Sequence, residues 1–298
     1  MKKVISILLS VTIVFMLFAG CTSSNSEGEI PNDESDNKQV TEELPAEPAH
    51  KTEVPEGYVG IYSVDDFEYI IIDGASTDKT LEIVNKYQDK IAKIISEKDG
   101  GIYDAMNKGI ANATGDYIVF LNADDVFLHE NVLKLAAEKM TDGKALYYGD
   151  LVFLEKSTGK LSNRRQNNVN YVYLCGGMLF HPAIFASKKL FEKVGNFNTK
   201  YRIVADYDWV IRALVQFKAS CAYLDMPITV FADGEGASSN PKNKERHKNE
   251  RTEVQKKYFS PFMICFSNFM YKSMRSALSA PIIKNILRAN FLKNRQDV

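Results

Sequence analysis

The chain has 298 residues, of which 45% are hydrophobic and 25% are charged, a balance typical of a globular protein. The formal net charge of -1 does not provide the basic surface that nucleic-acid binding requires, so we expect no nucleic-acid partner. The four cysteines are widely scattered and share no metal-ligand spacing, which argues against a cysteine metal site and against a disulfide scaffold.

The first 21 residues have the layout of an export signal, with a positive start followed by a short hydrophobic core. Two lysines precede the apolar run Val4–Phe18, and the ending Ala-Gly-Cys at Cys21 resembles the bacterial lipoprotein signal. This resemblance predicts a signal peptide over residues 1–21 and lipidation of Cys21. An uncleaved membrane anchor is the alternative, although the run is slightly short for a full span of about 20 residues.

The composition changes completely after Cys21. Ser, Asn, Glu, Asp and Pro dominate as far as Glu56, and such a segment cannot bury enough apolar surface to offset the entropy of ordering it. We therefore predict a disordered acidic linker over residues 22–57, a globular domain over residues 58–259 and a separate tail over residues 260–298.

Strands alternate with helices in the first half of the domain. Apolar, β-branched runs predict strands over residues 69–72, 92–96 and 118–121, and helical spacing of apolar residues predicts helices over 79–89 and 102–112. This β-α-β-α-β order implies right-handed crossovers and a mainly parallel sheet flanked by helices, which is an α/β fold.

The second half of the domain contains shorter elements. The pattern predicts helices over residues 130–140, 187–194, 205–215 and 243–257, and strands over 145–154, 171–174, 219–224 and 228–231. The tail from residue 260 alternates large apolar residues with Lys and Arg. A basic amphipathic helix of this kind can lie on an anionic membrane surface or pack against its own domain, and the sequence leaves both open.

Polar side chains follow the strand over residues 118–121 at once: Asn122, Asp124 and Asp125. In an open α/β sheet, ligands bind just outside the carboxyl ends of the strands. Hard oxygen ligands at this place suit Mg²⁺ or Mn²⁺ that holds the phosphates of a substrate. Taken alone, the motif is more simply interpreted as a strand that ends in an Asp-rich turn.

Three blocks between about Glu68 and Phe259 together resemble the family 2 glycosyltransferases. The blocks are Tyr69–Asp78, then Glu97–Asp125, then the set His181–Phe185, Gly195–Phe197 and Ala205–Trp209. The resemblance implies a GT-A fold, which is Rossmann-like. It also implies inverting transfer of a sugar from a nucleotide-sugar donor, expected to be a UDP-sugar, to a cell-surface polysaccharide or a glycolipid.

The resemblance also implies roles for single residues. Asp73 would accept a hydrogen bond from the N–H of a uracil or a similar base, although a helix-capping role competes. Asn122, Asp124 and Asp125 align with the Asp-x-Asp element, which holds the divalent ion and the donor ribose. Because Asn122 stands where the first Asp is usual, Asp124 is the preferred metal ligand.

The remaining roles are also carried over by resemblance. Asp206 would be the general base that takes a proton from the acceptor hydroxyl, but the helix dipole alone also favours carboxylates at this position. His181 is a candidate for the metal and diphosphate region, or a satisfied core residue. Asp104 and Lys108 would lie close to the donor, or on a solvated helix face.

The chain departs from the family pattern at its N-terminus. Members open with a strand, a loop and a helix before the strand over residues 69–72, and these elements are expected to be missing here. We hypothesise a lipoprotein front end joined to a truncated transferase, possible loss of activity, and a non-catalytic, membrane-anchored lipoprotein as the alternative function. A lipoprotein signal also implies export, whereas nucleotide sugars are cytoplasmic, so the two ends of the chain predict different compartments.

Overall fold

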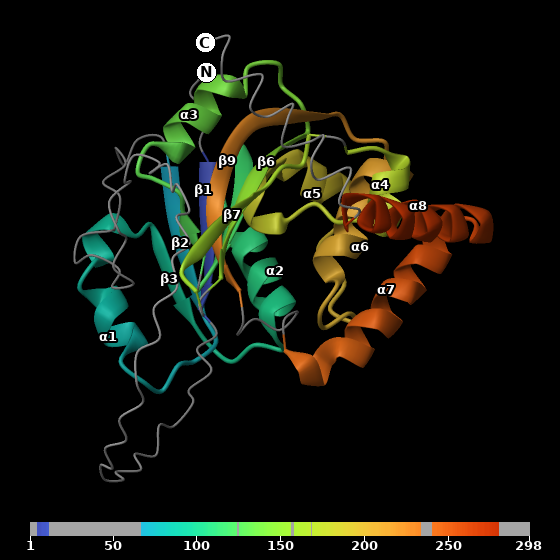
Figure 1. Ribbon diagram of the computed structural model, residues 1–298. Helices are drawn as coiled ribbons and strands as arrows, with labels where there is room; N and C mark the ends of the chain where they lie inside the picture. The colour runs from blue at the N-terminus through green and yellow to red at the C-terminus, as the bar shows by residue number, and fades with distance from the viewer. Residues whose placement is uncertain are drawn as a thin grey trace, which may run out of the picture. The chain divides into compact units, whose positions relative to one another are not determined.

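The computed structural model describes residues 5–11, 67–123, 125–155, 158–167, 169–233 and 240–279. Within this part of the chain, nine strands form one sheet in the order β3-β2-β1-β4-β8-β6-β9-β5, with β7 beside β6 (Figure 1). The strands are β1 (Ile5–Val11), β2 (Phe67–Asp73), β3 (Lys93–Ser96), β4 (Tyr117–Asn122), β5 (Val126–Phe127), β6 (Leu146–Glu155), β7 (Lys160–Arg164), β8 (Ile184–Ser187) and β9 (Cys221–Asp233). This sheet and its helices confirm the predicted α/β architecture.

Helices cover both faces of the sheet. They are α1 (Thr80–Asn85), α2 (Ile102–Asn112), α3 (Val132–Lys139), α4 (Tyr171–Gly176), α5 (Lys188–Val194), α6 (Ala205–Ile211), α7 (Lys244–Tyr258) and α8 (Pro261–Ser279). Successive side chains of a strand point to opposite faces, so Ile118 and Phe120 pack with α2 and α6, whereas Tyr117 and Val119 pack with α3. Both faces of β4 are therefore buried, as its unbroken apolar run predicts.

The sheet has a parallel half and a mixed half. The pairs β3-β2, β2-β1 and β1-β4 are all parallel, as the β-α-β order predicts. Beyond β4 the strand β8 runs antiparallel to both of its neighbours, β4 and β6. At this boundary the end of β4 at Asn122 contacts His181, which lies just before β8.

The N-terminal strand is the largest correction to the sequence-based expectations. β1 lies between β2 and β4 and pairs in parallel with both, from Ile5 opposite Phe67 to Val11 opposite Asp73. The prediction that the first strand is missing is therefore wrong, because the segment interpreted as a signal peptide supplies it. Cleavage of a signal peptide would remove this strand from the sheet. Cys21 and the predicted linker, residues 22–57, lie outside the described residues.

Two further predictions of secondary structure were wrong. Residues 171–174 begin the helix α4 and do not form a strand, because the side chain of Asn170 caps the helix by accepting from the N–H of Tyr173 (2.9 Å). The strands predicted over 219–224 and 228–231 are one strand, β9. Asp225 and Pro227 interrupt its apolar pattern, but the sheet continues through a local shift in register opposite Asp150.

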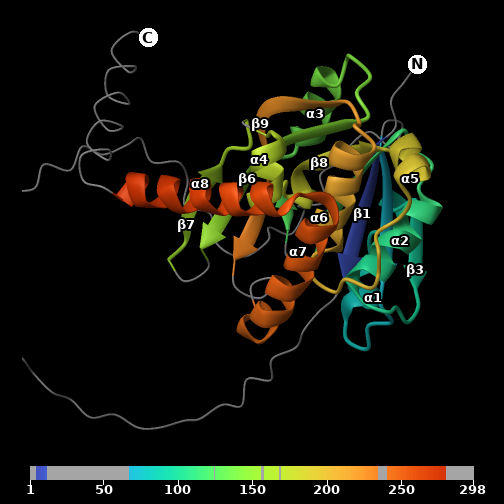
Figure 2. The same ribbon diagram turned by 90° about the vertical axis from the view of Figure 1, so that its right-hand side faces the viewer.

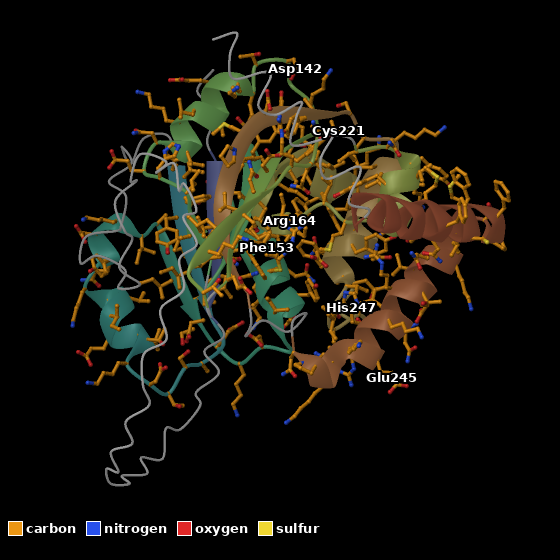
Figure 3. The ribbon with its side chains drawn as sticks, viewed as in Figure 1. Asp142, Phe153, Arg164, Cys221, Glu245 and His247 are labelled. Carbon is orange, nitrogen blue, oxygen red and sulfur yellow. The ribbon has the colours of Figure 1, made fainter. Side chains whose placement is uncertain are left out.

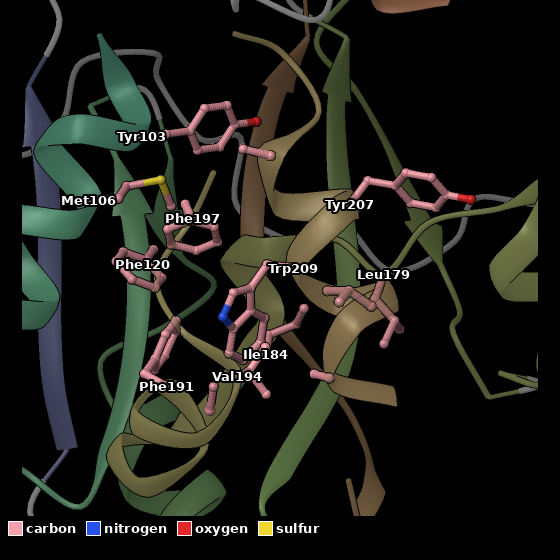
Figure 4. Packing of buried hydrophobic residues seen from close by; sticks show 14 of the residues in the cluster. Tyr103, Met106, Phe120, Leu179, Ile184, Phe191, Val194, Phe197, Tyr207 and Trp209 are labelled. Atoms are coloured by element: carbon pink, nitrogen blue, oxygen red, sulfur yellow. The ribbon is translucent and has the colours of Figure 1, made fainter. Parts of the chain in front are cut away.

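An aromatic cluster on the α2 side of the sheet supports the junction between the two halves (Figure 4). Phe191 stacks on Trp209 with ring centroids 4.3 Å apart, and Phe120 meets Phe197 edge-on at 5.4 Å. Asn107 of α2 exchanges two hydrogen bonds of 2.9 Å with the backbone of Phe197. The Gly-Asn-Phe block at residues 195–197 thus has a structural role, since it fastens α2 to the segment before α6.

The tail predicted to begin at residue 260 starts as helix α8, which Figures 1 and 2 show at the periphery, away from α1 and β3. In the part of the chain that is described, no helix is both long enough and apolar enough to cross a bilayer.

Candidate active site

Asp73 ends the parallel strand β2 and is fully buried. Its carboxylate accepts from the N–H of Ser76 (3.0 Å), from the hydroxyl of Ser76 and from the hydroxyl of Ser96 (2.6 Å). Burial alone raises the pKa of Asp73, but the hydrogen bonds from Ser76 and Ser96 outweigh burial and hold this pKa below its ordinary value. Asp73 is therefore an ionised acceptor at the strand end, where a donor nucleotide was expected.

Asn122 ends β4, which β1 separates from β2 in the sheet. Its backbone N–H donates to Asp125 Oδ2 (3.3 Å), and the N–H of Asp125 donates back to the Asn122 carbonyl (3.0 Å), which makes a tight turn. The side-chain oxygen of Asn122 is buried and has no partner in the described part of the chain. Asp124, the preferred metal ligand, lies outside the described residues.

His181 connects Asn122 to Asp206. Its Nδ1 lies 3.1 Å from Asp206 Oδ2, and its Nε2 lies 2.9 Å from Asn122 Nδ2. A carboxylate only accepts, so Nδ1 carries a proton, and a neutral ring then accepts from the Asn122 amide through Nε2. Both ring nitrogens thus have partners, and the predicted contact of His181 with a metal requires release of Asn122.

Asp206 lies in the first turn of α6, with only 5% of its side chain exposed. Its Oδ1 accepts from the Tyr103 hydroxyl (2.9 Å) and from the N–H of Tyr207 (2.9 Å). Burial and the negative charge of Asp206 raise the pKa of Tyr103 well above its ordinary value, so the hydroxyl stays protonated and remains a donor. The carboxylate is oriented by groups from α2, α6 and the turn at His181.

Tyr103 is a functional candidate that the sequence did not single out. It lies within the second motif block and points from α2 towards α6 (Figure 4). Its hydroxyl also lies 2.8 Å from the Ile203 carbonyl, so one proton is shared between that carbonyl and Asp206. The available signal in the sequence was a tyrosine, which carries a hydroxyl, on the apolar face of the predicted helix.

Asp208, the second carboxylate of the Asp-Tyr-Asp motif, has a different environment. It is 1% exposed and forms an ion pair with Arg212 Nε (2.8 Å) one turn along the helix. Arg212 also donates to the carbonyl of Val194 (2.7 Å), so the pair joins α6 to the end of α5. The structure therefore gives Asp208 a structural role.

Helix α7 holds the segment that leads into α6. Glu250 accepts from the N–H groups of Arg202 (3.0 Å) and Ile203 (2.9 Å). The guanidinium of Arg251 lies 4.2 Å from the centre of the Tyr207 ring and donates to the Gly177 carbonyl (2.6 Å). The sequence predicted a charged helix here without a role, and the structure shows that its charges position the residues beside Asp206.

His247 lies on the same helix, one turn before these anchors (Figure 3). Burial and the nearby positive charge of Arg251 lower the pKa of His247, and the charge of Asp206 opposes this shift. His247 is therefore mostly neutral at pH 7 and lies within electrostatic reach of Asp206.

Asp104 and Lys108 lie on α2 but contact a different region. Asp104 accepts from the N–H of Gly100 (2.9 Å), and Lys108 pairs with Glu97 (2.9 Å) and donates to the Lys98 carbonyl (2.9 Å). These partners all lie in the loop between β3 and α2 and not in the network of Asp206. Their assignment to the donor site stays a prediction.

The floor beneath His181 and Asp206 is packed. The cavity there has a volume of about 10 Å³ and is lined largely by apolar side chains such as Phe120 and Trp209. This is about the space that one water molecule needs, so a substrate cannot bind inside this cavity.

The residues at the end of β4 suit a divalent cation. Among the side chains that the structure describes, no three His, Cys, Asp or Glu groups converge on a common metal position. The unpartnered Asn122 oxygen and the Asp125 carboxylate are nevertheless hard oxygen donors at a strand end, the type that Mg²⁺ and Mn²⁺ prefer. Two such oxygens are of the type that the predicted ion prefers, and the metal site itself stays a prediction.

Comparisons with known proteins bear on the family and the fold of the chain. Residues 61–202 match the family model described as glycosyl transferase family 2. A protein of Mycobacterium bovis named PGL/p-HBAD biosynthesis glycosyltransferase is 31% identical over 192 residues, which cover 60% of this chain and 71% of that protein. An uncharacterized glycosyltransferase of Mycobacterium tuberculosis is 32% identical over 154 residues, which cover 49% of this chain and 56% of the relative.

A solved structure has a similar fold. TarS from S. aureus in complex with UDP has a TM-score of 0.50 and 17% sequence identity to this chain. The match covers 65% of this chain and 56% of the TarS chain, so this chain spans little more than half of that solved protein. At this identity the likeness shows the fold alone.

Proposed function

Because the chain belongs to glycosyl transferase family 2, we propose that it transfers a sugar from a UDP-sugar to a hydroxyl group of a cell-surface polysaccharide or glycolipid. The observation that carries this proposal is the buried network Asn122–His181–Asp206–Tyr103, which joins the end of β4 to α6. This network supports a general base, Asp206, close to the end of β4, where a nucleotide-sugar donor is expected to bind.

On the donor side, Asp73 accepts the N–H of the nucleotide base. The carboxylate is fully buried and already receives bonds from Ser76, Ser96 and the backbone of Ala75, so a base has to displace one of these donors to reach it. Asp124 would hold Mn²⁺ or Mg²⁺, with Asn122 and Asp125 beside it at the donor, and the ion would offset the charge of the leaving diphosphate.

On the acceptor side, Asp206 is the general base. The acceptor oxygen attacks the anomeric carbon on the face opposite the diphosphate and loses its proton to Asp206, while the bond from that carbon to the diphosphate breaks. One displacement of this kind inverts the anomeric configuration. Tyr103, Tyr207 and His181 hold the carboxylate in one orientation during the proton transfer, which a general base requires.

We propose that the transferase works at the cytoplasmic face of the membrane. The supporting observation is the position of β1 between β2 and β4, because export with cleavage of the signal would remove this strand. Under this proposal the N-terminal segment stays in the mature protein and Cys21 is not its first residue.

Calorimetric titration of the purified chain with UDP, with and without Mn²⁺, tests the donor proposal. We expect binding that requires Mn²⁺ and that disappears in Asp124→Ala. Asp116→Ala is the matched control, since this exposed aspartate lies at the opposite end of β4 and should leave binding unchanged. Equal binding in both variants, or no binding of UDP by the unmodified chain, would contradict the proposal.

A further inference from the structure

The outer face of α8 exposes large apolar side chains. Phe262 is 75% exposed, Phe269 is 65% exposed, and Phe266 and Met270 are 38% and 37% exposed. Their spacing of four, three and one residues places them on one face of the helix. The rings of Phe262 and Phe266 stack with centroids 6.1 Å apart, and we call this row of four exposed side chains the apolar ridge.

The opposite face of α8 is fixed to the domain. Met263 and Ile264 pack against the main core, and Ser267 is fully buried. Just before the helix, the Phe259 ring lies 5.0 Å from that of Tyr171 on α4. The helix therefore has a defined orientation, and the apolar ridge points outward because its other side is already occupied.

The chain around this ridge carries an excess of positive charge. Between residues 254 and 296 there is no Asp or Glu, and the basic residues are Lys256, Lys257, Lys272, Arg275, Lys284, Arg288, Lys293 and Arg295. The whole chain has a net charge of -1, so this excess is local. A helix with an apolar ridge and a basic flanking sequence has the properties of one that lies in the interface of an anionic membrane.

We propose that α8 docks the protein onto an anionic membrane surface, with Phe262, Phe266 and Phe269 inserted below the level of the headgroups. The basic residues complement the negative charge of the lipids. A second copy of the chain fits less well, because it would bring the same basic segment against itself. This inference does not depend on the proposed reaction.

Co-sedimentation of the full chain with vesicles tests the proposal. We expect binding to vesicles of phosphatidylglycerol and phosphatidylcholine, no binding to phosphatidylcholine alone, and weakening at high salt because the Debye length shortens. The triple variant Phe262→Ser, Phe266→Ser, Phe269→Ser should bind at least tenfold more weakly. The double variant Ile83→Ser, Leu161→Ser is the matched control, since both side chains are 52% exposed elsewhere on the surface.

Two further measurements keep the outcomes distinct. Thermal melting should be the same in the triple variant as in the unmodified chain, and UDP titration should be unaffected, which separates this test from that of the donor. Unchanged vesicle binding in the triple variant would overturn the proposal. The proposal would also be overturned if the unmodified chain formed a dimer that bound no vesicles and if the triple variant were a monomer. The ridge would then be a contact between two copies of the chain.

Discussion

The carboxylates of Asp73 and Asp206 are both buried, but their partners come from different distances along the chain. Asp73 is held by Ser76, three residues later, and by Ser96 on the adjacent strand β3. Asp206 is held by Tyr103, which is 103 residues away, and by His181, which is 25 residues away. The first carboxylate is positioned within one β-α-β unit, whereas the second is positioned only when α2, α6 and the turn at His181 pack together.

The difference shows that the two sides of the site depend on different parts of the fold. The surroundings of Asp73 form wherever β2 and β3 pair. The surroundings of Asp206 need the junction between the parallel and the mixed halves of the sheet. β1 lies between β2 and β4, so it joins the strand that ends in Asp73 to the strand that ends in Asn122.

Deletion of residues 1–11 should have the largest effect on both regions. It removes a central strand with neighbours on both sides, so we expect a chain that does not fold cooperatively. Circular dichroism during thermal unfolding measures this. Deletion of Lys2 and Lys3 alone is the control, because it leaves β1 whole. Mass spectrometry of protein purified from its own cells adds a second measurement, and a mature chain that begins at Cys21 would contradict the role of β1.

Asp206→Asn should lower kcat by roughly 10²–10⁴-fold, the usual contribution of a general base. We expect UDP affinity to stay within a factor of two, since Asp206 acts on the acceptor. Asp225→Asn is the control, because that exposed aspartate has a positive φ that asparagine also tolerates. A loss of activity that appears in KM alone would argue for a role in binding.

Tyr103→Phe should have a smaller effect. It removes the one hydroxyl proton that Asp206 and the buried Ile203 carbonyl share, so we expect a loss of about 1–3 kcal/mol in the free energy of unfolding. We also expect a fall of about tenfold in kcat, because Asp206 loses one of the groups that orient it. Urea unfolding and initial rates measure the two effects. Unchanged kcat would show that Tyr103 supports only the fold.

The smallest expected effect is on the free energy of unfolding at acidic pH, to which the ionised Asp73 contributes. Its pKa in the folded chain lies below the ordinary value of 3.8, so the stability that it contributes is present above pH 3.8 and is lost as the pH falls through the folded pKa. The double variant Ser76→Ala, Ser96→Ala should be less stable by about 1 kcal/mol at pH 7. This difference should shrink below pH 3.8, whereas Ser162→Ala, on an exposed strand, should show no such dependence.

A stability difference that stays constant from pH 7 to pH 2.5 would contradict this account of Asp73. It would mean that the two serines stabilise the fold by packing and not by their hydrogen bonds to the carboxylate. Urea unfolding at a series of pH values makes this comparison directly.

Local patterns predicted much of the fold correctly. Helix α2 occupies residues 102–112 as its apolar spacing indicates, and α5 and α7 begin and end within one residue of the predicted bounds. The strand ends at Asp73 and Asn122 were also predicted, because an apolar run that stops at a polar residue marks the end of a buried strand. These features depend on neighbours in sequence.

Other features depended on contacts that no local pattern records. The apolar run near the N-terminus is compatible with a signal peptide and with a buried strand. Only its pairing with both β2 and β4 in the tertiary structure identifies it as a strand. The choice of Asp206 over Asp208 came from the family resemblance, and the partners of each carboxylate now support it with a physical reason.

The sequence by itself determined the α/β class, the family and the positions of the acidic strand ends, since these follow from periodicity and from motifs within short segments. The tertiary structure alone decided that β1 completes the sheet, that Tyr103 and His181 orient Asp206, and that α8 turns its phenylalanines outward. The physical reason is that burial and hydrogen bonding across 25 to 103 residues depend on how the elements pack and not on the pattern within any one of them.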